Sequence, residues 1–253
     1  MTEPLHGTAT SPLRVERSGD RVVATLHRPE VRNAIDQALV DDLHALCAEL
    51  ESEPRTLVLT GADGVFASGA DISQLRERRA ADARAGINTT VFRRIHDLPM
   101  PVIAAIDGYA LGGGAELAYA ADLRIGTPAL RIGNPEPGLG IIAAAGATWR
   151  LPAIVGEARA AELLLTGRIL DADEALAWGL VASLHPADGL LGAAHRLADR
   201  IGRLDPLAVQ HTKRALAAPA AAHPALELEL QAELFERPEK HERMTAFLER
   251  RRR

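Results

Sequence analysis

Short apolar runs alternate with segments of helical spacing through the first 150 residues of the chain. The runs at 21–26, 56–61 and 101–108 predict buried β-strands, and the stretch 122–133 predicts two short strands joined at Thr127 and Pro128. A capped helix is predicted after Asp36, where apolar residues follow at helical spacing: Leu39, Leu43, Leu46, Cys47 and Leu50. Strands and helices that alternate in this way are typical of a parallel α/β architecture.

From about residue 157 the apolar spacing is helical and remains so. No stretch rich in proline and serine separates the two halves, and the sequence contains no tandem repeat. The pattern therefore predicts one α/β core with a helical C-terminal region. We assign residues 1–12 to a disordered leader, residues 13–195 to the core that contains the active site, and residues 196–253 to the helical region.

Three consecutive glycines, Gly112 to Gly114, stand directly before a helical pattern. A helix N-terminus exposes N–H groups and glycine lets a ligand come close, so such a site can bind a phosphate or stabilise an oxyanion. No GxxxxGK[ST] pattern is present, and no GxGxxG precedes a ribose-binding acid, which disfavours a phosphate site. Close helix–strand packing is the alternative use of these glycines. The segment 66–72, FASGADI, offers a second N–H from a separate loop, which favours an oxyanion hole.

Two glutamates accompany these glycines. Glu116 stands in the first turn after the glycine run, and Glu136 stands between two prolines in the segment NPEPGLG, residues 134–140. Each glutamate alone is more typical of a surface or capping carboxylate. Together, and with one of them held in a stiff turn, they are a candidate acid/base pair.

Five segments, taken in this order, resemble the enoyl-CoA hydratase/isomerase (crotonase) family: RPEVRNAID, TGADGVFASGADI, PVIAAIDGYALGGGAELAYAADLRI, NPEPGLGI and LLLTGRILDADEALAWGLV. The resemblance covers nearly the whole chain. It implies an α/β, crotonase-like spiral of repeated ββα units with a helical C-terminal trimerisation region. It also implies a homotrimer or a dimer of trimers that acts on an acyl-CoA thioester.

The resemblance assigns the site residue by residue. Ala70 in SGAD and Gly113 in LGGG would supply the two N–H donors of an oxyanion hole, and Glu116 and Glu136 would be catalytic. The expected substrate-binding residues are Arg32, Ala34, Ser68, Asp71, Ile72, Gly112, Pro135 and Ala144. For Asp71 the competing interpretation is a helix cap.

Because both glutamates are present, the resemblance favours an enoyl-CoA hydratase, which adds water across the C2–C3 double bond of a trans-2-enoyl-CoA. Glu116 would activate the water and Glu136 would protonate C2. The alternatives are an enoyl-CoA isomerase or another crotonase-type enzyme, and a non-catalytic relative that binds acyl-CoA or RNA. After NPEPGLGII the chain reads AAAGATWRL, residues 143–151, and there Ala144 and Trp149 replace the usual Gly and Gln, a departure that bears on substrate choice.

Composition and charge exclude several classes of binding partner. The net charge of −5 and an aromatic content of 3% disfavour nucleic acid, and no apolar run approaches the ~18 residues of a membrane span. The nine histidines show no metal-ligand spacing, so no metal site is expected. No cofactor is expected either, because the coenzyme A implied by the resemblance is part of the substrate. Cys47 is the only cysteine and excludes an intrachain disulfide. Residues 1–12 lack the pattern of a signal peptide, which favours a cytoplasmic protein.

Overall fold

The computed structural model describes residues 11–251. The predicted leader, residues 1–12, therefore lies outside the described residues except for its last two positions. Ser11 Oγ donates a hydrogen bond to Asp42 Oδ2 over 3.0 Å, and the backbone N–H of His27 donates to the Pro12 carbonyl over 2.8 Å. These two residues are thus held against the core.

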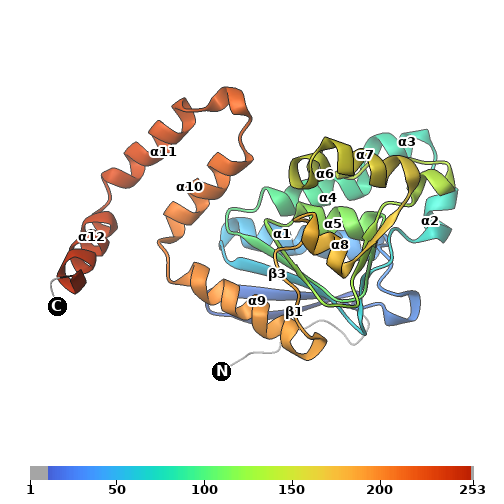
Figure 1. The fold of residues 1–253 in the computed structure, drawn as a ribbon, viewed down its shortest axis with the longest axis horizontal. Helices are drawn as coiled ribbons and strands as arrows, with labels where there is room; N and C mark the ends of the chain where they lie inside the picture. Colours follow the sequence, from blue (N-terminus) through green and yellow to red (C-terminus); the bar gives the residue numbers. More distant parts are fainter. Residues whose placement is uncertain (1–10, 252–253) are drawn as a thin grey trace. The chain divides into compact units, whose positions relative to one another are not determined.

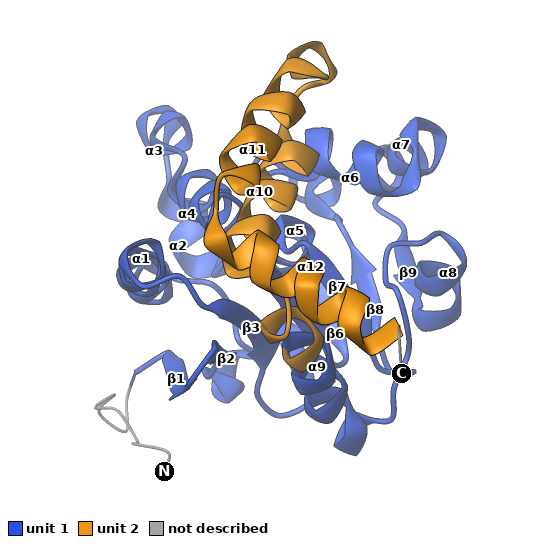
Figure 2. Ribbon diagram, turned by 90° about the vertical axis from the view of Figure 1, so that its left-hand side faces the viewer, with its two compact units in different colours: residues 1–198 blue, residues 199–253 orange. Residues whose placement is uncertain are grey.

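The chain forms two compact units, residues 1–198 and residues 199–253 (Figure 2). The division falls inside a single helix, α9 (Ala187–Gly202), whereas the sequence placed it after residue 195. The cavity and the glycine run discussed below belong to the first unit alone.

Two mixed sheets form the first unit. One has five strands in the order β1-β2-β3-β5-β7 and the other has four in the order β4-β6-β8-β9. Figure 1 draws the strands as arrows and labels β1 and β3 of the five-stranded sheet. Neighbouring strands are parallel except in the pairs β1–β2 and β8–β9, which are antiparallel. Their bounds are β1 (Leu13–Ser18), β2 (Arg21–Leu26), β3 (Thr56–Gly61), β4 (Val65–Ala67), β5 (Val102–Ile106), β6 (Tyr109–Leu111), β7 (Leu123–Gly126), β8 (Arg131–Gly133) and β9 (Ile169–Asp171).

From β3 to β8, successive strands alternate between the two sheets, so that β3 and β4, then β5 and β6, then β7 and β8 each contribute one strand to each sheet. Helices follow each pair, which gives the repeated ββα unit of the crotonase spiral and confirms the predicted fold class. The two strands predicted within 122–133 are present, but they belong to different sheets. The segment 66–72, assigned to a loop from the sequence, overlaps the end of β4, a strand too short to give an alternating pattern.

The helices of the first unit cover the sheets and carry the site. Their bounds are η1 (Pro29–Val31), α1 (Gln37–Ser52), α2 (Ile72–Glu77), α3 (Ala80–Ala85), α4 (Ile87–His96), α5 (Gly113–Ala120), η2 (Glu136–Leu139), α6 (Ala147–Val155), α7 (Glu157–Thr166) and α8 (Ala172–Ala177), followed by α9. Asp36 caps α1, because its Oδ1 accepts from the Leu39 N–H over 2.9 Å. The apolar residues that predicted this helix are buried, and burial raises the pKa of the Cys47 thiol to about 12.

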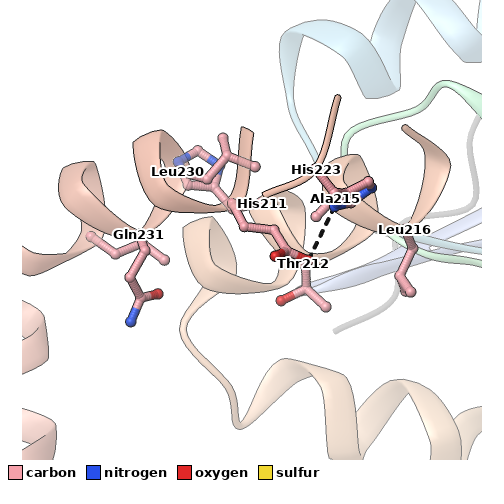
Figure 3. Close-up of a pocket in the computed structure, with 9 residues that line it drawn as sticks. His211, Thr212, Ala215, Leu216, His223, Leu230 and Gln231 are labelled. Atoms are coloured by element: carbon pink, nitrogen blue, oxygen red, sulfur yellow. Dashed lines mark ion pairs between the residues drawn. The ribbon is translucent and has the colours of Figure 1, made fainter. Parts of the chain in front are cut away.

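The second unit contains α10 (Pro206–Ala217), η3 (Ala220–Ala222), α11 (Ala225–Phe235) and α12 (Pro238–Arg251). A hollow of about 430 Å³ lies between α10 and α11, and Figure 3 shows the side chains that line it. The dashed line there joins His223 to Glu227, whose Nδ1 and Oε1 atoms are 3.1 Å apart. This unit also exposes large apolar side chains: Leu204, Leu216, Leu228, Phe235, Met244, Phe247 and Leu248.

Candidate active site

A cavity of about 530 Å³ opens in the first unit where β4, β6 and β8 meet the helices that follow them. Nine of the residues predicted for the site line it: Ser68, Ala70, Ile72, Gly112, Gly113, Glu116, Pro135, Glu136 and Ala144. Arg32, Ala34 and Asp71 do not line it. They lie on or beside segment 32–36, which pairs with the Ala70 loop through Ile35: its N–H donates to the Gly69 carbonyl and its carbonyl accepts from the Asp71 N–H.

Asp71 caps α2. Its Oδ1 accepts from the Ser73 N–H over 3.0 Å, and its pKa is lowered, first by the hydrogen bond from the Ser73 hydroxyl. Arg28 stands 3.7 Å from the other carboxylate oxygen. The capping interpretation of Asp71 is thus supported, and its backbone also fixes one side of the Ala70 loop.

Each of the three glycines has its own reason to be glycine. Gly112 has a φ of 52°, a left-handed value that side chains disfavour, and a Cβ there would lie 3.1 Å from Glu136 Oε1. A Cβ on Gly114 would lie 2.3 Å from the Ala67 carbonyl oxygen, so close packing excludes a side chain. The helix begins at Gly113, not after the run, and a Cβ at Gly113 would lie 3.3 Å from Asn88 Nδ2 and 3.5 Å from the Ala70 backbone nitrogen, both in residues that line the cavity.

The backbone N–H groups of Ala70 and Gly113 are available to a ligand. Within residues 11–251, neither donates a hydrogen bond to the protein. Gly113 is the first residue of α5, where N–H groups have no partner inside the helix and the helix dipole is positive. Ala70 follows β4 and Gly113 begins α5, and both residues line the same cavity.

Glu116 lies on α5 with 3% of its surface exposed. Its Oε1 accepts two backbone hydrogen bonds, from Ala145 over 2.6 Å and from Ala147 over 3.1 Å. Burial raises the pKa of Glu116 to about 7, and the nearby charge of Glu136 adds to the rise, while the two backbone bonds oppose it. This carboxyl group therefore changes its charge near neutral pH.

Glu136 begins η2 between Pro135 and Pro137 and is 8% exposed. Asn134 Nδ2 donates to its Oε1 over 3.4 Å, and the Tyr119 hydroxyl donates to Asn134 Oδ1 over 3.1 Å. Its other oxygen, Oε2, is buried and has no hydrogen-bond partner among the described residues. Burial raises the pKa of Glu136 as well, so the protonated form is favoured beyond its usual range.

Sequence reasoning missed several residues that shape this cavity. Ala145 and Ala147 act on Glu116 through their backbone N–H groups, and the side chains at these positions give no indication of those bonds. Asn88 on α4 lines the cavity, and its carboxamide oxygen is buried without a partner in the described part of the chain. A polar residue one turn before the buried Val91, Phe92 and Ile95 was the only signal. No cluster of metal-ligating side chains occurs within residues 11–251.

Comparison with known proteins fits this geometry. The sequence model of the family described as enoyl-CoA hydratase/isomerase matches residues 18–253. The chain belongs to the enoyl-CoA hydratase/isomerase family. It is 37% identical over 246 residues to a short-chain-enoyl-CoA hydratase of Clostridium acetobutylicum, which covers 94% of both chains. It is 36% identical over 249 residues to a 2,3-dehydroadipyl-CoA hydratase of Escherichia coli, with 95% of this chain and 97% of that one covered.

The solved structure of an enoyl-CoA hydratase from Bacillus anthracis superposes with a TM-score of 0.90 at 32% identity, covering 94% of this chain and 96% of that one. As a member of the enoyl-CoA hydratase/isomerase family, this chain is a crotonase-type acyl-CoA enzyme. Along residues 11–251, no helix has the length and apolar character needed to cross a bilayer.

Proposed function

We propose that the protein is an enoyl-CoA hydratase that adds water to the C2–C3 double bond of a trans-2-enoyl-CoA thioester. One observation carries the proposal. Two buried carboxyl groups, Glu116 and Glu136, line one cavity together with the available N–H groups of Ala70 and Gly113. Hydration needs a base for the water, an acid for C2 and donors for the thioester oxygen, and this cavity offers a group for each.

The thioester oxygen would accept from Ala70 and Gly113. As water adds to C3, negative charge grows on that oxygen, and N–H donors that already point at it stabilise the charge without rearrangement. The dipole of α5 adds to the stabilisation because Gly113 is its first residue. Loss of one such donor costs about 3–4 kcal/mol in the barrier.

Proton transfer would use the two glutamates. Glu116, ionised, takes a proton from the water whose oxygen bonds to C3, while Glu136, protonated, gives its proton to C2. A pKa of about 7 suits a base at neutral pH, and a raised pKa suits an acid that must hold its proton. The two groups are coupled, and the pair holds one proton throughout: it lies on Glu136 before the reaction and on Glu116 afterwards, and exchange with water restores the starting state.

The other predicted residues would bind the rest of the substrate. Ser68, Ile72, Gly112, Pro135 and Ala144 line the cavity and would contact the thioester and the acyl chain. We assign the coenzyme A portion to the neighbouring segment 32–36, which holds Arg32 and Ala34, and to Asp71 beside it, because these residues lie next to the oxyanion loop but outside the cavity.

The departures from the family pattern have definite positions. Ala144 lines the cavity, so its methyl group occupies space that glycine would leave to water or acyl chain. Trp149 is 50% exposed and stands outside the cavity lining. The change at Ala144 therefore bears on substrate choice more directly than the change at Trp149. The names of the relatives, among them a short-chain-enoyl-CoA hydratase, support a compact acyl group.

The second candidate is a double-bond isomerase, which would use the same oxyanion hole with one main base. Crotonyl-CoA distinguishes the two candidates, because its enoyl absorbance falls on hydration and does not fall on isomerisation. We expect the purified protein to bleach crotonyl-CoA, and Glu136→Gln to lose at least about a hundredfold in kcat, since an amide cannot donate the catalytic proton. Glu249→Gln, at an exposed position, is the matched control. Turnover at the wild-type rate in folded Glu136→Gln would remove Glu136 from the mechanism.

We also propose that the chain assembles as a trimer or a dimer of trimers. The second unit leaves large apolar side chains such as Leu216, Leu228 and Phe247 exposed, and their exposure to water is unfavourable. A closed cyclic assembly that uses the same surface on each copy would cover them.

A further inference from the structure

Asn88 occupies an unusual place in the cavity. It stands in the first turn of α4, and its Nδ2 lies 3.3 Å from the position that a Cβ on Gly113 would take. The backbone nitrogen of Ala70 lies 3.5 Å from that same position. The carboxamide of Asn88 and the two proposed oxyanion donors therefore border one small space, which exists because residue 113 has no side chain.

The carboxamide has no hydrogen-bond partner within residues 11–251, and its Oδ1 is buried. A buried amide oxygen without a partner is unfavourable, and such groups in folded proteins call for an explanation. The rest of this face of α4 is apolar, with Val91, Phe92 and Ile95 fully buried. A leucine at position 88 would continue that pattern, so the local fold does not require asparagine.

Neighbouring contacts hold Asn88 in place. The Thr89 hydroxyl donates to the Ala144 carbonyl over 2.9 Å and so ties the start of α4 to the loop that binds Glu116. Gly86, with a φ of 62°, ends α3 and begins α4. The carboxamide is thus presented from a helix whose N-terminal end is fixed by the Thr89 contact and by the turn at Gly86.

We propose that Asn88 is a third hydrogen-bond donor to the thioester carbonyl, acting through Nδ2 beside the N–H groups of Ala70 and Gly113. The inference rests on the proposed function and adds a residue to its site. A donor to the developing oxyanion contributes most where the charge is greatest, so its loss lowers kcat more than it weakens binding.

The test compares Asn88→Leu, which keeps the approximate shape, with Asn88→Asp, which replaces the donor by a carboxylate. With crotonyl-CoA we expect kcat to fall about ten- to a hundredfold in Asn88→Leu, with KM changed by less than about threefold. Asn88→Asp should fall further, because its charge opposes the oxyanion. Thr90→Val, on the same helix but outside the cavity lining, should behave as wild type.

A spectroscopic readout separates this inference from the proposed reaction. Butyryl-CoA labelled with ¹³C at the carbonyl can bind but cannot be hydrated, and its carbonyl stretch falls in frequency with each hydrogen bond it accepts. The frequency in the Asn88→Leu complex should lie closer to that of free ligand than in the wild-type complex. If the wild type fails to hydrate crotonyl-CoA, the function is wrong, yet this shift still decides the role of Asn88.

Two results would overturn the assignment. One is an unchanged carbonyl frequency in both Asn88 variants. The other is a change in KM that depends on acyl-chain length while the frequency stays constant, because Asn88 would then contact the chain and not the carbonyl. If Asn88→Leu does not fold by circular dichroism, the nearly isosteric Asn88→Asp variant gives the same decision.

Discussion

Replacing Glu116 by glutamine should make the protein more stable at alkaline pH while it abolishes hydration. The fold raises the pKa of Glu116 from its ordinary value of 4.5 to about 7, chiefly by burial. Between these values the folded chain keeps a proton that the unfolded chain releases. The stabilising contribution of this proton is therefore present below pH 4.5 and is lost as the pH rises through 7.

The size of the effect follows from the same two values. One pKa unit corresponds to about 1.4 kcal/mol, so the rise at Glu116 makes wild-type unfolding about 3 kcal/mol easier at pH 8 than at pH 4.5. Glutamine has nearly the same shape, and its carbonyl oxygen can still accept from Ala145 and Ala147. Because it carries no charge at either pH, Glu116→Gln should be free of this loss.

Urea unfolding followed by circular dichroism measures the difference. Wild type and Glu116→Gln are compared at pH 4.5 and pH 8 at one protein concentration, so that any assembly contributes equally. Titrating groups other than Glu136, which is coupled to Glu116, cancel when the pH-dependent change in the variant is subtracted from that in the wild type. Glu249→Gln serves as the control for loss of an exposed carboxylate. If Glu116→Gln and wild type lose the same free energy between the two pH values, the burial argument for Glu116 is refuted.

The remaining predictions concern the glycine run and the assembly. Gly113→Pro should lower kcat by roughly two to three orders of magnitude with less than about a tenfold change in Kd for butyryl-CoA, since proline fits the first turn of a helix but has no N–H. A folded Gly113→Pro variant with near-normal kcat would return this glycine to a packing role. Gly114→Ala should instead lower the melting temperature, because its Cβ would meet the Ala67 carbonyl at 2.3 Å. Light scattering should give three or six times the chain mass of 27.0 kDa, and a monomer at micromolar concentration would contradict the proposed assembly.

The parts of the fold that could be predicted are the elements whose own residues show a recognisable pattern of apolar or capping positions. Strands 56–61 and 102–106 are buried on both faces and appear as apolar runs, and Asp36 marks the start of α1. The three-residue β4 was missed, because a strand so short is defined by its partner β6 and not by its own residues.

The site divides in the same way. Glu116 and Glu136 could be identified as side chains in distinctive surroundings, and the family resemblance placed Ala70 and Gly113. The bonds from Ala145 and Ala147 to Glu116 could not be predicted, since backbone N–H groups occur at nearly every residue and only the folded path of the loop aims them. Asn88 was missed for a related reason: its relation to Gly113 joins residues of two helices, and spacing along the chain does not report it.

Through its two backbone hydrogen bonds, the protonation state of Glu116 affects how firmly the loop that carries Ala145 and Ala147 is held. An ionised carboxylate holds the Ala145 and Ala147 N–H groups through charge-assisted bonds, which are stronger than bonds to a neutral carboxylic acid. In the proposed reaction Glu116 is ionised before the chemical step and protonated after it has taken a proton from water. The loop that carries Ala145 and Ala147 is therefore held most firmly before the chemical step and less firmly after it. This change would make the cavity wall more mobile when the hydroxyacyl product has to leave.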